Sequence, residues 1–151
     1  MKSKILIPSV AFFILFAMGA YFLINPSYEK SLKAKYYFET GDYKEALVLA
    51  KEAFSMDVYN RMASTVMAQS ITSLKYVTYN NDAKKYMYSI NEIAKHDVIS
   101  DADKAKIRTI CNIMIDSYIK LAPSVITDSD LVDDAAKYYD SFEKLLEKVT
   151  R

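Results

Sequence analysis

Glycine and proline are scarce in this chain, which has two glycines and three prolines among its 151 residues. So few of them leave little material for tight β-turns or flexible linkers. The two glycines, Gly19 and Gly41, are also too far apart to form a glycine-rich phosphate-binding loop. We therefore predict an all-α protein.

An excess of one charge sign is missing as well. The 20 basic and 19 acidic residues give a formal net charge of +1. Nucleic-acid-binding proteins concentrate an excess of lysine and arginine on their surface. This balance predicts that nucleic acid is not a partner.

The residues used most often in acid-base and metal chemistry are nearly absent. The chain has one histidine, His96, and one cysteine, Cys111, so no zinc-ligand spacing and no Ser-His-acid arrangement can be drawn. The acidic stretch from Asp128 to Asp134 lacks the central glycine and the closing glutamate of a calcium loop. We predict no catalytic, metal-binding or cofactor-binding residue, and we interpret His96 as a residue at a helix end.

Cys111 has no second cysteine with which to form an intramolecular disulfide. Apolar residues repeat around it at helical spacing: Ile107, Ile110, Met114, Tyr118 and Leu121. This pattern predicts a small buried side chain rather than a reactive thiol.

The most specific positive signal is the uncharged run from Ile5 to Ile24, which is 20 residues long. A helix of that length crosses a bilayer core of about 30 Å. Twelve of its residues are Ile, Leu, Phe or Val, and each favours insertion by about 0.3–0.6 kcal/mol near the membrane centre. We predict that residues 1–25 form a transmembrane anchor.

Orientation and processing of this segment follow from its flanks. Lys2 and Lys4 precede the run, so the positive-inside rule places the N-terminus in the cytoplasm and the rest of the chain on the extracytoplasmic, periplasmic side of the inner membrane. Ala17 and Gly19 form an A-x-G pattern similar to a signal-peptide cleavage site, so a secreted, cleaved product is the alternative. Both interpretations export residues 26–151.

Residues 26–151 are expected to form one α-helical domain. Apolar periodicity predicts six helices, at 27–39, 43–56, 59–78, 82–96, 101–121 and 129–149. Short connections between amphipathic helices favour antiparallel neighbours, so we expect three helical hairpins.

Residues typical of helix ends mark the expected breaks. Asn25 and Pro26 begin the first helix, Gly41 supplies a positive φ, and the stretch Asn80-Asn81-Asp82 breaks the chain between the third and fourth helices. Pairs of a hydroxyl and a carboxylate three residues later predict the starts of the fifth and sixth helices: Ser100 with Asp103, and Thr127 with Asp130.

The first hairpin carries a family resemblance. Its sequence has a small residue and then an aromatic in the first helix, a Gly-Asp-Tyr turn, and small residues where two helices cross. These places are held by Ala34, Tyr37, Gly41, Tyr43, Ala46 and Ala53. Residues 27–58 therefore resemble a tetratricopeptide repeat, although Lys30 stands where that family has a large apolar residue.

The resemblance implies a protein-binding role. In helical-repeat families the first helix of each hairpin lines a groove, which here implies contact of Tyr28, Lys35, Phe38 and Glu39 with a protein partner. We therefore expect a membrane-anchored, non-enzymatic scaffold of an envelope complex. The alternatives are an assembly chaperone or accessory subunit of an envelope machine, and a non-catalytic subunit of a membrane enzyme.

Overall fold

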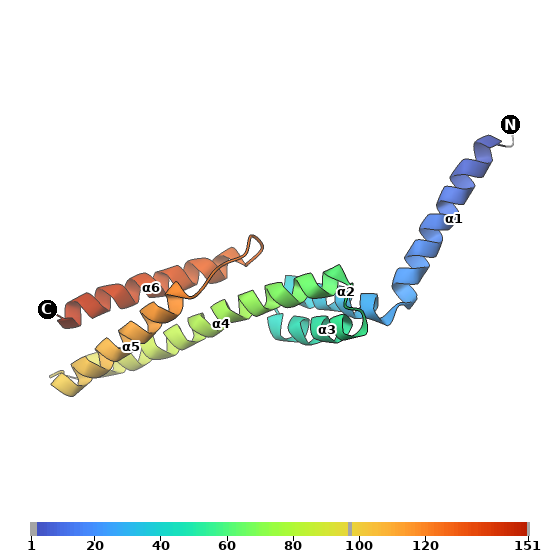
Figure 1. The fold of residues 1–151 in the computed structure, drawn as a ribbon. Helices are drawn as coiled ribbons and strands as arrows, with labels where there is room; N and C mark the ends of the chain where they lie inside the picture. The colour runs from blue at the N-terminus through green and yellow to red at the C-terminus, as the bar shows by residue number, and fades with distance from the viewer. Residues whose placement is uncertain (1–2, 97, 151) are drawn as a thin grey trace. The chain divides into compact units, whose positions relative to one another are not determined.

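The computed structural model describes residues 3–96 and 98–150, and in this part of the chain all regular structure is helical (Figure 1). The helices are α1 (Ser3–Ile24), α2 (Pro26–Glu39), α3 (Tyr43–Met56), α4 (Arg61–Ala94), α5 (Asp101–Ile119) and α6 (Ser129–Thr150). The all-α prediction is confirmed. Lys2, whose charge enters the orientation argument, lies outside the described residues.

The chain divides into two compact units, Met1–Ser70 and Ile71–Arg151. The division falls within α4, so the first part of this helix belongs to unit 1 and the remainder to unit 2. Each unit has its own apolar cluster of buried side chains.

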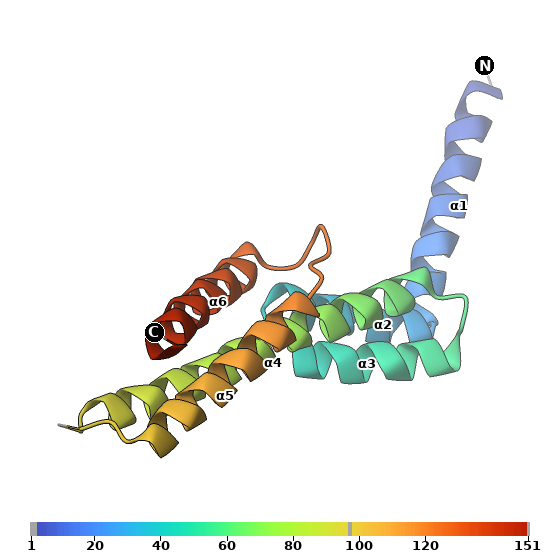
Figure 2. The same cartoon turned by 60° about the vertical axis from the view of Figure 1, so that its left-hand side comes forward.

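Local chemistry at helix ends explains the hairpin of α2 and α3 in unit 1. The Asn25 side chain accepts a hydrogen bond of 3.0 Å from the Ser27 N–H, and Pro26 occupies the first turn, where its missing N–H costs nothing. Gly41 takes a φ of +84°, a conformation that disfavours a residue with a Cβ. Asp42 then caps α3 by accepting from the Glu45 N–H at 3.2 Å. The two helices are antiparallel neighbours (Figure 2).

Small residues let α2 and α3 approach each other closely. Ala34, Ala46 and Ala50 are fully buried, and with Val66 at the start of α4 they form the core of unit 1. Partly buried side chains surround this core: Tyr37, Phe38, Leu49, Met62 and Met67. Close packing of this kind is what the alanine pattern of the first hairpin predicts.

Helix α1 presents large apolar side chains on all sides. Over the part whose side chains are described, Val10, Phe13 and Phe16 are each more than half exposed, as are most of their neighbours. Within the described residues no single helix combines the length and hydropathy needed to cross a membrane; Ile7–Tyr21 and Pro26–Glu39 meet that requirement only as a pair, bent by 77°.

The predicted break at Asn80-Asn81-Asp82 is wrong, because α4 continues without interruption from Arg61 to Ala94. The Asn80 amide does not cap a helix; its Nδ2 donates to the Leu131 carbonyl at 3.0 Å. Tyr79 and Ala83, on either side, are buried in the core of unit 2. The expected second hairpin is therefore a single helix, and the arrangement of three hairpins is corrected to two.

Unit 2 packs α5 and α6 against the later part of α4. Its core contains Ile90 from α4, Cys111 and Met114 from α5, and Phe142 from α6, with the Phe142 side chain fully buried. Cys111 is fully buried, as its apolar neighbours at helical spacing predict.

The ends of α5 and α6 test the two predicted caps. Ser100 and Asp103 form the expected capping box, with the Asp103 N–H donating to Ser100 Oγ at 3.1 Å. For α6 the predicted cap Thr127 is wrong by one residue. The Asp128 carboxylate accepts from the Asp130 N–H at 2.9 Å, whereas Thr127 Oγ1 accepts from the Ser124 N–H in the preceding turn.

Candidate interaction surface

The residues predicted to contact a partner all lie on α2. With 100° between successive residues, Tyr28, Lys35, Phe38 and Glu39 share one broad side of this helix. Lys35 Nζ is 3.6 Å from Glu39 Oε1, and both side chains are more than half exposed. An exposed pair of this kind contributes about 0–1 kcal/mol to stability, so both charges remain available to a partner.

The two aromatic residues of this set are less accessible than the charged ones. Phe38 is half-buried, with its ring 5.4 Å from that of Tyr43 in an edge-on arrangement, and it packs against the core of unit 1. Tyr28 is also half-buried, and its ring lies 6.3 Å from that of Tyr21 in α1. Lys35, Phe38 and Glu39 therefore fall within about one turn of α2, whereas Tyr28 lies about two turns away beside α1.

The residues that carry the repeat resemblance lie in α2, in α3 and in the turn between them. Ala34, Ala46 and Ala53 are fully buried, and Tyr43 is 8% exposed. Tyr37 is half-buried, and its ring packs edge-on against that of Tyr36 at 5.7 Å. Gly41 provides the turn.

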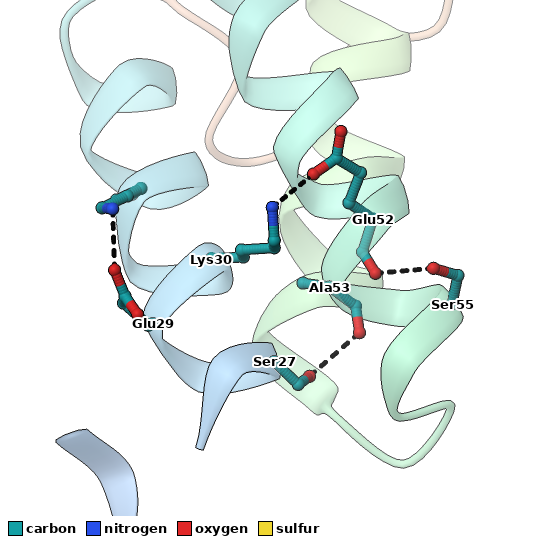
Figure 3. A network of polar contacts seen from close by, with 7 residues as sticks. Ser27, Glu29, Lys30, Glu52, Ala53 and Ser55 are labelled. Carbon is teal, nitrogen blue, oxygen red and sulfur yellow. Dashed lines mark hydrogen bonds and ion pairs between the residues drawn. The ribbon is translucent and has the colours of Figure 1, made fainter. Parts of the chain in front are cut away.

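A buried polar network joins three helices and was not predicted from the sequence. Asn60 is fully buried, and its Nδ2 donates to Ser27 Oγ at 2.9 Å and to Ser31 Oγ at 3.2 Å. Ser27 Oγ donates to the Ala53 carbonyl at 2.9 Å (Figure 3). Asn60 Oδ1 accepts from the Ala63 N–H at 3.1 Å and so caps α4. The network ties the start of α2 to the end of α3 and the start of α4.

The sequence held one weak signal for this network. Ser27 and Ser31 are one turn apart on α2, so they share a face, and that face also carries Ala34. A row of small residues indicates a close helix contact, but it does not identify Asn60 as the partner.

An ion pair reinforces the same end of unit 1 at its surface. Lys30 Nζ lies 2.5 Å from Glu52 Oε2, linking α2 to α3 (Figure 3). Lys30 is the residue that departs from the repeat pattern, and the pair gives this departure a physical reason. A second pair, Glu29 with Lys33, lies along α2; hydrogen bonding and the opposite charge lower the pKa of the Glu29 carboxyl and raise the pKa of the Lys33 ammonium.

The described part of the chain contains no group of three or more His, Cys, Asp or Glu side chains that could hold a metal ion. His96 lies just beyond the end of α4, where its backbone N–H donates to the Ile93 carbonyl at 3.2 Å. Burial raises the pKa of the Cys111 thiol, which disfavours the reactive thiolate.

Three tyrosines gather in unit 2. The Tyr118 and Tyr139 rings stack at 4.5 Å, and the Tyr79 ring lies 5.7 Å from that of Tyr118. Burial raises the pKa of Tyr79 far above its ordinary value. The cluster acts as packing between the three helices of the unit.

No family model, no curated protein and no solved structure matches the chain.

Proposed function

We propose that this protein is a non-enzymatic interaction module, anchored in the inner membrane by the helix from Ile5 to Ile24. Its helical part, residues 26–151, would lie on the periplasmic side and bind protein partners of an envelope complex. The observation that carries the proposal is the uncharged run of 20 residues. Support comes from the exposure of large apolar side chains on α1, because soluble monomers seldom expose a contiguous apolar surface of this size.

The orientation and the binding face remain parts of the same proposal. Lys2 and Lys4 favour a cytoplasmic N-terminus. The tetratricopeptide-like pattern of residues 27–58 favours α2 as the helix that meets the partner, through the side carrying Lys35 and Glu39. The presence of one histidine and one cysteine in the sequence supports binding rather than chemistry.

Membrane anchoring is tested with two charges placed in the middle of α1, as Phe13→Arg with Ile14→Arg. The substitutions remove two of the twelve strongly apolar residues, so the remaining ten favour insertion by about 3–6 kcal/mol, whereas two arginines near the centre oppose it by about 5–7 kcal/mol. We expect the variant to leave the membrane fraction. The matched control places two arginines at exposed tyrosines outside α1, Tyr36→Arg with Tyr88→Arg, and should stay membrane-bound.

The size of the N-terminus is measured in the same samples. An intact N-terminus in the membrane fraction is the expected result. A shortened chain in the soluble fraction would instead establish the secreted, cleaved product and remove the anchor from the proposal.

Partner binding is tested by crosslinking the native protein in membranes, followed by identification of the crosslinked proteins. We expect the charge exchange Lys35→Glu with Glu39→Lys to reduce capture of the principal partner, because the exchange keeps the ion pair of α2 and reverses the surface charges. The matched control exchanges Glu29→Lys with Lys33→Glu, an ion pair of the same helix roughly a third of a turn away. Equal capture by both variants and the parent would refute the assignment of this face.

A further inference from the structure

The α3–α4 turn exposes three large apolar residues almost consecutively. Met56, Val58 and Tyr59 are 54%, 60% and 86% exposed. We call these three residues the apolar tip. They lie at the end of α3 and in the turn that follows it, not on a helix face that another helix of unit 1 covers.

The polar network holds the apolar tip beside the point where α1 ends. Asn60 directly follows Tyr59 and donates to Ser27 at 2.9 Å, and Ser27 also donates to Ala53 in the last turn of α3. Ser27 is separated from Ile24 by Asn25 and Pro26 alone. A span of three residues extends for at most about 10 Å. The tip is therefore tethered close to the C-terminal end of α1 by hydrogen bonds and by the chain itself.

This position indicates which surface the apolar tip contacts. We propose that Met56, Val58 and Tyr59 insert into the lipid headgroup region next to the anchor, so that unit 1 contacts the bilayer at two points. The inference rests on the proposed function, because it requires α1 to end at the periplasmic surface of the membrane. The interfacial layer is about 5–8 Å thick on each side of the hydrocarbon core. Ser27 lies within about 10 Å of the end of α1 and is hydrogen-bonded to Asn60, the residue that follows Tyr59, so the tip is held next to this layer.

The chemistry of the tip suits that layer. Tyrosine is enriched at membrane interfaces because its ring is apolar and its hydroxyl is polar. The carboxylate of Asp57, within the same turn, already accepts the Tyr59 N–H at 2.9 Å. Arg61 is exposed directly after the turn, where a guanidinium group attracts lipid phosphates. Asp57 and Arg61 give the turn one charge of each sign, so we expect it to bind a zwitterionic lipid surface without anionic lipid.

The chain contains no tryptophan, so a single introduced tryptophan reports its own surroundings. Full-length Tyr59→Trp is reconstituted into phosphatidylcholine vesicles with and without brominated acyl chains, and its fluorescence is recorded. We expect a blue-shifted emission and strong quenching by the brominated lipid. Tyr36→Trp is the matched control, since Tyr36 is 64% exposed near the opposite end of α2 and should remain unquenched.

A third variant, Phe13→Trp, separates failure of the docking from failure of the anchor. Quenching of Phe13→Trp without quenching of Tyr59→Trp would overturn the docking and leave the anchor in place. Absence of quenching in both would overturn the anchor and the docking together. A Tyr59→Trp emission that is blue-shifted but insensitive to brominated lipid would assign the tip to contact with a second copy of the chain, and would also overturn the proposal.

Discussion

The buried amide of Asn60 gives the most informative test of how unit 1 is held together. Replacing it as Asn60→Ala removes two hydrogen bonds donated to the serines of α2 and one accepted from the Ala63 N–H. The last of these is the cap of α4, so its loss leaves a backbone N–H in the first turn without its partner. Water cannot replace the lost hydrogen-bond partner, because Asn60 is fully buried, and the alanine side chain has no polar group.

The expected magnitude follows from those three bonds. A typical internal hydrogen bond contributes about 1 kcal/mol net, and a stranded buried polar group costs about 1–3 kcal/mol. We therefore expect Asn60→Ala to destabilise unit 1 by about 3 kcal/mol. Because about 1.4 kcal/mol is a factor of ten, this loss corresponds to an increase of about a hundredfold in the population of open states.

Amide hydrogen exchange on the full chain measures this effect helix by helix. We expect protection to fall by about a hundredfold in α2 and α3, with a smaller change in α5 and α6. The matched control is Ser100→Ala, which removes the exposed capping hydroxyl of α5 and should cost about 1 kcal/mol, in unit 2 only. If Asn60→Ala lowers protection in α2 and α3 by less than tenfold, the network is not what joins these helices and the reasoning is refuted.

Two further predictions concern helix ends. Gly41→Ala should destabilise the α2–α3 hairpin by about 1–2 kcal/mol, because a residue with a Cβ disfavours the φ of +84° although there is open space around Gly41. Gly41→Asn should lose less stability, and equal thermal stability of Gly41→Ala and the parent would contradict this prediction. Hydrogen bonding from Ser100 lowers the pKa of the Asp103 carboxyl. The contribution of this carboxylate to stability is therefore present above its unfolded-state pKa and is lost as the pH falls through its folded-state pKa. The carboxyl titration of Asp103, followed by NMR, should have its midpoint below the ordinary 3.8, and Ser100→Ala should move it upward; an unchanged midpoint would rule out the capping box as the cause.

Features that depend on neighbouring residues were predictable from the sequence. The start of α2 at Pro26, the positive φ of Gly41 and the capping box of Ser100 each follow from chemistry within three residues. The predicted range 43–56 coincides with α3 because Gly41 and Asp42 mark its start. The alanines at the crossing of α2 and α3 were also identified, since small residues at helical spacing indicate close packing.

Features that depend on residues far apart in the chain were not predictable from the sequence. Asn60 meets Ser27 and Ser31 from more than 25 residues along the chain, and no local pattern joins them. Asp128 caps α6 in place of Thr127 because Thr127 Oγ1 is taken by the Ser124 N–H within the preceding turn. The residues predicted to contact a partner share one side of α2, and the packing of Phe38 against Tyr43 leaves the two charged residues, Lys35 and Glu39, as its accessible part.

The break expected at Asn80 failed because local preference is small beside burial. Asparagine and aspartate disfavour a helix interior by up to about 0.7 kcal/mol each, so Asn80, Asn81 and Asp82 together oppose the helix by about 2 kcal/mol. Burial of a large apolar side chain contributes about 1.5–3 kcal/mol, and a continuous α4 keeps Tyr79 on the same buried side as Ile90. Those two residues alone outweigh the three polar ones. The Asn80–Leu131 hydrogen bond adds to this side of the balance, so a helix break here would have required a glycine or proline, which the chain does not have at this place.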